Sequence, residues 1–183
     1  MEPLTHKDID EKYQKSVFIQ DYSKKPVIEG VQIIELRNMI GEDGDLTEVG
    51  RFTDGGEHEQ FPGFHIRQIN RSLVMPGSIK AWHLHFNQDD IWHVLPHERM
   101  TIALWDVRKD SPTKNSTMKL PVGGGRSYLV YIPRGVAHGA VNHALTPATI
   151  LYFVNQQFDI ANPDERRLPW DSLGEEFWIA PKE

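Results

Sequence analysis

The chain contains no cysteine, and this absence excludes disulfide bonds, thiolate catalysis and cysteine-based zinc sites. Positive charge is also scarce, because 20 Lys and Arg residues face 26 Asp and Glu residues and leave a formal net charge of −6. Such a chain has no positive field to hold nucleic acid or an anionic membrane. No apolar run reaches the length of a bilayer, and the N-terminus carries charges where a signal peptide needs apolar residues. We therefore expect a cytoplasmic protein that neither inserts into membranes nor binds nucleic acid.

What the chain does contain is a series of short apolar segments separated by turn residues, over a length that suits one domain with a single core. Residues 1–26 are polar and charged and are interpreted as an N-terminal arm, and residues 27–183 as the single domain. The pattern of alternation predicts strands at 31–36, 64–71, 79–86, 90–95, 100–107, 128–132, 139–143 and 149–158. This series predicts an all-β sandwich or barrel with short helical segments at the termini.

Two histidines, His83 and His85, stand two residues apart in the run Lys80-Ala-Trp-His-Leu-His-Phe-Asn87. Alternate side chains of a strand point to the same face, so the two imidazoles are expected side by side, with Trp82 and Leu84 on the other face. Neutral imidazole is a base near physiological pH and also the commonest metal ligand. The pair therefore indicates either a proton-transfer site or a metal site.

The surroundings of these histidines resemble the two-part cupin signature. In the first part, Gly77 precedes His83 by six residues and Asp90 follows His85 by five. The second part, Pro-x-Gly-x-x-His-x-x-x-Asn, is complete in residues 133–142 and contains His138. The resemblance implies a cupin jelly-roll β-barrel, in which these histidines line one cavity.

A longer series of motifs resembles a particular cupin family, the dTDP-4-dehydrorhamnose 3,5-epimerases. The motifs are Gln68-x-Asn70-x-Ser72, Leu84-His-Phe-Asn87, Asp106-Val-Arg-Lys-Asp-Ser-Pro-Thr113, Ile132-Pro-Arg-Gly-Val-Ala-His-Gly139, Ile150-Leu-Tyr152, Trp170-Asp171 and Trp178. The match to the family covers about residues 27–178. The resemblance implies a homodimer that exchanges N-terminal strands and an isomerase without a cofactor. It also implies a sugar-nucleotide substrate in surface-polysaccharide, lipopolysaccharide or deoxysugar biosynthesis.

The resemblance also implies roles for individual residues. Epimerisation beside a keto group removes a carbon-bound proton, forms an enolate and returns a proton to the opposite face, which requires a base and an acid. The family's base matches His85, its acid matches Tyr152, and a second barrel histidine matches His138. Phe158 matches an aromatic residue that stacks on the nucleotide base. The remaining candidate substrate-binding residues are Gln68, Asn70 and Trp82.

By the same motifs, the chain resembles a divergent member of this family. Trp82 stands where the family has an arginine, Asp90 where it has a lysine, and a further arginine corresponds to about Asp45. The aspartate that orients the family's catalytic histidine belongs to a C-terminal motif that is absent after Trp178. Cationic side chains form the stronger, charge-assisted hydrogen bonds to a diphosphate, so their replacement weakens the expected diphosphate contacts.

Two alternatives remain open at the level of sequence. A metal-dependent cupin enzyme would bind a divalent metal ion through His83, His85, Asp90 and His138, which together offer three nitrogens and one carboxylate. A catalytically degenerate cupin would bind a carbohydrate without turnover.

Overall fold

The computed structural model of the protein describes residues 2–20 and 27–181. Two short helices precede the first strand: the 3₁₀ helix η1 (His6–Asp8) and α1 (Glu11–Gln14), and a second 3₁₀ helix, η2 (Glu175–Trp178), lies near the C-terminus. The strands are β1 (Gln32–Leu36), β2 (Asn38–Gly41), β3 (Gly44–Thr47), β4 (Gln68–Val74), β5 (Ile79–Leu84), β6 (Asp90–Val94), β7 (Arg99–Asp106), β8 (Thr117–Gly123), β9 (Ser127–Ile132), β10 (Val136–Val141), β11 (Ala148–Val154) and β12 (Arg166–Arg167).

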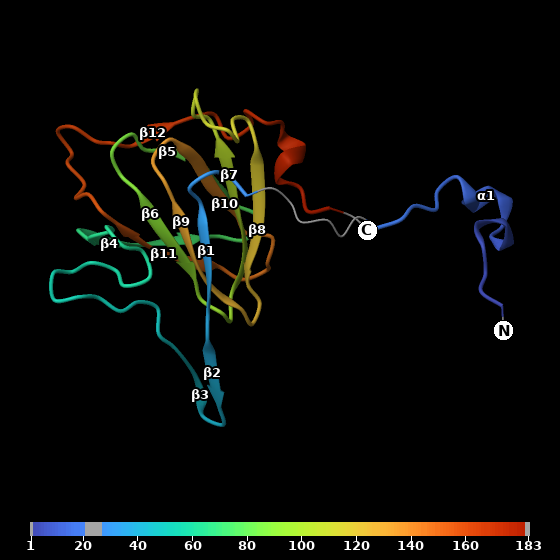
Figure 1. The fold of residues 1–183 in the computed structure, drawn as a ribbon, viewed down its shortest axis with the longest axis horizontal. Helices are drawn as coiled ribbons and strands as arrows, with labels where there is room; N and C mark the ends of the chain where they lie inside the picture. The colour runs from blue at the N-terminus through green and yellow to red at the C-terminus, as the bar shows by residue number, and fades with distance from the viewer. Residues whose placement is uncertain (1, 21–26, 182–183) are drawn as a thin grey trace.

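Ten of these strands form two antiparallel sheets that face each other as a jelly-roll barrel (Figure 1). One sheet has the order β1-β9-β6-β11-β4, and the other has the order β12-β5-β10-β7-β8. The remaining strands, β2 and β3, form a hairpin that extends away from the barrel (Figure 1). The expected all-β cupin architecture with short terminal helices is confirmed.

The main hydrophobic core fills the space between the two sheets. Inward-facing residues of both sheets meet there, including Val94 and Ile150 from one sheet and Ile102 and Leu104 from the other, all at most 2% exposed. Burial of such side chains stabilises each by about 1.5–3 kcal/mol relative to exposure. Elsewhere in the barrel interior the inward-facing side chains of β4, β5, β6 and β10 are polar, and they surround a cavity.

The alternation of β4 is inverted relative to an ordinary amphipathic strand. Gln68, Asn70 and Ser72 line the cavity inside the barrel, whereas Ile69 and Leu73 on the other face are 58% and 39% exposed. A hydrophobic pattern alone would direct the apolar set inward. The polar set faces inward here because the barrel end that it borders is a cavity and not a core.

Each sheet is also covered on its outer face. Phe61 and Phe64, from the long segment between β3 and β4, pack on Ile91 and Leu129 of the first sheet. The outer face of the second sheet is covered by the C-terminal segment, whose Trp178 contacts β5. Packing on the outer faces of both sheets therefore stabilises the strands that line the cavity.

Several strand limits differ from the sequence prediction. β5 ends at Leu84, so His85 follows the strand, and β10 begins at Val136 and not at residue 139. The two helices of the N-terminal arm contain no buried residue. The expected boundary between arm and domain at residue 26 lies outside the described residues. Among the described residues, no helix is long and apolar enough to span a membrane.

Candidate active site

The interior of the barrel contains a cavity of about 910 Å³. Its walls come from β4, β5, β6, β10 and β11, and its rim comes from residues 156–167. Most of the candidate site residues line it: Gln68, Asn70, His83, His85, Asp90, His138, Tyr152 and Phe158. A cavity of this size suits a substrate of nucleotide-sugar dimensions.

Three histidines meet on one side of the cavity. His83 on β5 is the register partner of His138 on β10, and their rings stack with centroids 5.8 Å apart. The ring of His85, directly after β5, lies 5.2 Å from that of His138. The prediction that His83 and His85 share one face is therefore confirmed, even though the second lies past the strand.

The tautomer of His85 is set by the main chain. Its Nδ1 lies 2.5 Å from the carbonyl oxygen of Asp164, and a carbonyl only accepts, so Nδ1 carries the hydrogen and donates. The lone pair is then on Nε2, which lies on the cavity side, 4.0 Å from an oxygen of Asp90 and 3.9 Å from one of Glu165. In the neutral tautomer that this contact selects, His85 presents the Nε2 lone pair to a molecule in the cavity.

The side chain of Asp164 fixes the segment that follows His85. Its carboxylate accepts hydrogen bonds from the backbone N–H groups of Phe86, Asn87 and Gln88, at 2.7–3.2 Å. Burial acts to raise the pKa of this carboxyl, but these three donors outweigh it and hold the pKa below its usual value. Asp164 thus fixes His85 through its carbonyl and the following turn through its carboxylate.

His138 is a buried, neutral imidazole. Its Nδ1 donates to the carbonyl oxygen of Val136 at 3.0 Å, which leaves the Nε2 lone pair facing Asp90 at 3.7 Å. Burial, together with the charges of His85 and His83, holds the pKa of His138 well below its usual value. The lowered pKa favours the neutral imidazole over the cation in this site.

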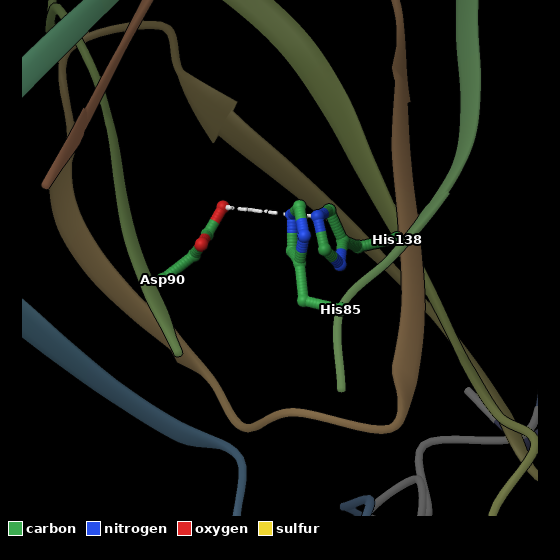
Figure 2. A group of neighbouring side chains, drawn as sticks. All are labelled: His85, Asp90 and His138. Atoms are coloured by element: carbon green, nitrogen blue, oxygen red, sulfur yellow. Dashed lines mark ion pairs between the residues drawn. The ribbon is translucent and has the colours of Figure 1, made fainter. Parts of the chain in front are cut away.

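Asp90 is a buried carboxyl that faces both imidazoles from one side (Figure 2). Its oxygens accept from Gln88 Nε2 at 2.7 Å and from Trp92 Nε1 at 3.0 Å. Burial raises the pKa of Asp90, and the His85 charge and these two hydrogen bonds only partly offset that effect. Asp90 and Trp92 line the cavity, whereas His93, which alternates with them along β6, does not.

His85, Asp90 and His138 form a compact cluster (Figure 2). Each offers one ligand atom, and the three atoms lie within 4.8 Å of one another. Two imidazole nitrogens and a carboxylate oxygen, with both histidines oriented by main-chain carbonyls, form a donor set that can hold a divalent transition metal. His83, the fourth residue of the metal alternative, lies outside this three-residue cluster.

His83 is engaged by charged residues of the rim. Its Nδ1 lies 2.7 Å from Glu165 Oε1 and donates to it, while its Nε2 accepts from Arg167 Nη1 at 3.0 Å. Arg167 Nε also contacts Glu165 Oε1 at 2.9 Å. Burial acts to raise the pKa of Glu165, but the hydrogen bond and charge of His83, with His85 and Arg167, lower it overall.

Tyr152 extends into the cavity from β11. Its register partners are Asn70 on β4 and Trp92 on β6. Burial raises the pKa of the phenol, and the charges of Asp90 and Glu165 raise it further. The group therefore keeps its proton at neutral pH, as an acid that protonates an enolate must.

The two polar candidates on β4 have different environments. Gln68 Nε2 donates to Asn70 Oδ1 at 2.7 Å, and Gln68 Oε1 accepts from the backbone N–H of Phe158 at 3.0 Å. Gln68 therefore positions the loop that carries Phe158. Phe158 is 60% exposed and borders the cavity.

Trp82 is not a substrate-binding residue, and that prediction was wrong. The side chain is 0% exposed and packs between Trp105, Phe177 and Trp178 on the outer face of the sheet. Alternation explains the error, because the neighbour of a cavity-facing His83 must face the other way. The family's arginine position thus contributes to packing here.

Three residues that border the cavity, Asp164, Glu165 and Arg167, were not predicted from the sequence. They follow Asn162-Pro163 in a segment without strand periodicity and lie about 80 positions from the histidines that they contact. The only local signal was the pair of adjacent carboxylates, and nothing in the sequence indicated that β12 pairs with β5.

The fold and the site together define a cupin whose cavity is lined by histidines and carboxylates, groups that can transfer protons. The comparisons with known proteins agree. The family described as dTDP-4-dehydrorhamnose 3,5-epimerase matches residues 25–177. The spore coat polysaccharide biosynthesis protein SpsL of Bacillus subtilis is 37% identical over 145 residues, covering 79% of this chain and 91% of SpsL.

Two further similarities support the same conclusion. The probable low-salt glycan biosynthesis epimerase Agl13 of Haloferax volcanii is 30% identical over 146 residues, covering 80% of this chain and 90% of Agl13. A crystal structure of a dTDP sugar isomerase from Desulfovibrio desulfuricans G20 superimposes with a TM-score of 0.69 at 26% identity, covering 80% of this chain and 88% of that one.

The chain belongs to the dTDP-4-dehydrorhamnose 3,5-epimerase family. It is a sugar-nucleotide epimerase or related ketosugar isomerase of polysaccharide and deoxysugar biosynthesis. Neither the metal-dependent cupin nor the carbohydrate-binding protein without turnover is favoured by this membership.

Proposed function

We propose that the protein epimerises a dTDP-4-keto-6-deoxyhexose by abstracting a proton from a carbon next to the keto group, with His85 as the base. One observation carries the proposal: the Asp164 carbonyl holds His85 with its Nε2 lone pair on the cavity side. A base needs this unprotonated nitrogen at the reacting carbon. No step requires a metal ion, because enolate formation needs only a base and a proton donor.

In this proposal Tyr152 supplies the acid, and His138 is a neutral group near the keto oxygen. The raised pKa of Tyr152 keeps its proton available for the face of the enolate opposite His85. His138 Nδ1 is already committed to Val136, so its ring orientation is fixed before substrate binds. A preorganised polar group of this kind stabilises charge that develops in the transition state.

Nucleotide binding is assigned to the mouth of the cavity. Phe158 stacks on the base, and Gln68 holds the loop in place. Among the described residues that line the cavity, the cationic side chains are Lys80 and Arg167, and they are proposed to contact the diphosphate. They replace the cations that the family places at the positions of Trp82 and Asp90.

The proposed assembly is a homodimer. β1 lies at the edge of its sheet, and the β2–β3 hairpin that continues from it exposes Met39, Ile40 and Leu46 at 43%, 81% and 65%. An exposed edge followed by an apolar hairpin favours pairing with a second copy. Analytical ultracentrifugation tests this, and a monomer at micromolar concentration would contradict it.

The test of the chemistry is deuterium wash-in from solvent at the carbons beside the keto group of a dTDP-4-keto-6-deoxyhexose. We expect exchange with the native protein and a loss of about 1,000-fold or more with His85→Asn. The matched control is His143→Asn, which changes a histidine outside the cavity lining. Absence of exchange in the native protein with every nucleotide ketosugar tested would reject the proposal.

A further inference from the structure

Glu165 connects the unusual histidine, His83, to the proposed base. Its Oε1 accepts from His83 Nδ1 at 2.7 Å and from Arg167 Nε at 2.9 Å, while its Oε2 lies 3.9 Å from His85 Nε2. We propose that Glu165 receives the proton that His85 removes from the sugar and releases it to solvent at the cavity mouth. This inference rests on the proposed role of His85 as base.

The reaction requires such an outlet for protons. Once His85 has taken a proton from carbon it is an imidazolium and cannot act as a base again. It must therefore lose that proton in every turnover, and twice if two carbons of the same sugar are inverted. The other ring nitrogen offers no exit, because Nδ1 is bound to the carbonyl oxygen of Asp164.

The Nε2–H of the His85 imidazolium gives its proton to Glu165 Oε2, which regenerates the neutral imidazole and forms a carboxylic acid. The acid then gives the proton to water and returns to the carboxylate. A movement of about 1 Å, or one bridging water, brings the two atoms from 3.9 Å to hydrogen-bond distance.

Asp90 lies at nearly the same distance from His85 Nε2, but it is a poor outlet. Its side chain is 3% exposed, and its oxygens are bound by Gln88 and Trp92 inside the barrel. The Glu165 side chain is 34% exposed and belongs to the rim. Of these two carboxylates, only Glu165 joins the base to solvent.

His83 and Arg167 become positioning residues in this arrangement. Because Arg167 donates to Nε2 of His83, the hydrogen of that ring is on Nδ1 and binds Glu165. Together the two side chains hold Oε1 and leave Oε2 directed at His85. His83 thus assists the loss of the proton from His85 to Glu165 and takes no part in the removal of the proton from the sugar.

Glu165→Gln tests the proposal because the amide keeps the shape and can still accept from His83 but cannot carry the proton. We expect kcat for wash-in to fall about 10- to 100-fold with KM nearly unchanged. We also expect the rate to recover in proportion to added imidazole or formate, since a diffusible buffer can discharge His85. The matched control is Glu48→Gln, which alters an exposed glutamate that also pairs with an arginine, Arg51.

A native kcat in Glu165→Gln overturns the relay, and so does a reduced kcat that buffer does not rescue, which would indicate a structural or binding role. If that variant does not fold, Glu165→Asp is measured by the same two criteria, since it keeps a carboxylate but withdraws it by one methylene. Failure of the proposed function has a different signature, namely no exchange in the native protein.

Discussion

His85 Nδ1 donates to the carbonyl oxygen of Asp164 at 2.5 Å, while the carboxylate of the same aspartate accepts from three consecutive backbone N–H groups just after His85. One residue of the rim therefore fixes both the tautomer of the base and the turn on which the base stands. In the proposed mechanism, this contact orients the imidazole of the base.

Replacing that carboxylate tests how much the turn matters. Asp164→Ala leaves three N–H groups without their acceptor, so we expect kcat to fall about 10-fold, with a loss of about 1–3 kcal/mol in the free energy of unfolding. Steady-state wash-in and denaturant unfolding measure the two effects. A comparison with Asp159→Ala, another rim aspartate, controls for the loss of negative charge at the mouth.

Tyr152→Phe removes the proposed acid without changing the shape of the cavity wall. We expect epimerised product to form about 100-fold or more slowly, because a positioned acid contributes at least that factor. Proton abstraction by His85 should be affected less, so wash-in ought to exceed product formation. Product analysis by NMR compares the two rates in one sample, and equal, native rates would argue against the role of Tyr152.

Trp82 is expected to matter for stability alone. Trp82→Ala leaves a large cavity in the outer layer and should lower the free energy of unfolding by about 3–5 kcal/mol. Trp82→Phe should be much milder, since it keeps an aromatic ring and removes a buried indole N–H that has no hydrogen-bond partner. The KM of the Trp82→Phe variant should equal that of the native protein. A large increase in KM would indicate that Trp82 contacts the substrate after all.

The buried histidines predict the pH dependence of stability. Burial, with the charges of His85 and His83, lowers the pKa of His138, and burial likewise lowers the pKa of His58 and His93. Below about pH 6.5 the unfolded chain binds protons that the folded chain does not, so stability falls as pH falls. Melting temperatures from pH 8 to pH 5 should decline, and His138→Gln should reduce the slope of that decline.

Chelation separates the proton-transfer mechanism from the metal alternative. We expect the wash-in rate to be unchanged after dialysis against a chelator, since His85, Asp90 and His138 are assigned to proton chemistry. Zinc added afterwards should inhibit, because it would bind the Nε2 lone pair that abstracts the proton. Loss of activity on chelation and its return with metal would favour the metal-dependent enzyme instead.

The barrel and most cavity residues were predictable from sequence because they depend on local alternation and on short motifs. His83 and His138 came from separate motifs and meet across β5 and β10 as expected. Glu165 and Arg167 were not predictable, because their contacts depend on a two-residue strand, β12, that has no periodic signal. The same alternation that predicts His83 in the cavity predicts its neighbour Trp82 on the opposite face. Trp82 was nevertheless predicted as a substrate-binding residue because it occupies the position at which the family has an arginine.

The use of a main-chain carbonyl to orient His85 has a consequence for how this enzyme tolerates mutation. A side-chain carboxylate in that role is lost by a single codon change, whereas a peptide oxygen is present whichever amino acid occupies position 164. A substitution at position 164 is therefore expected to leave the tautomer of His85 unchanged. An insertion or deletion between β11 and β12 is expected to disturb it, because it would move the carbonyl of residue 164. Sequence drift in this segment is expected to preserve its length more strictly than its composition.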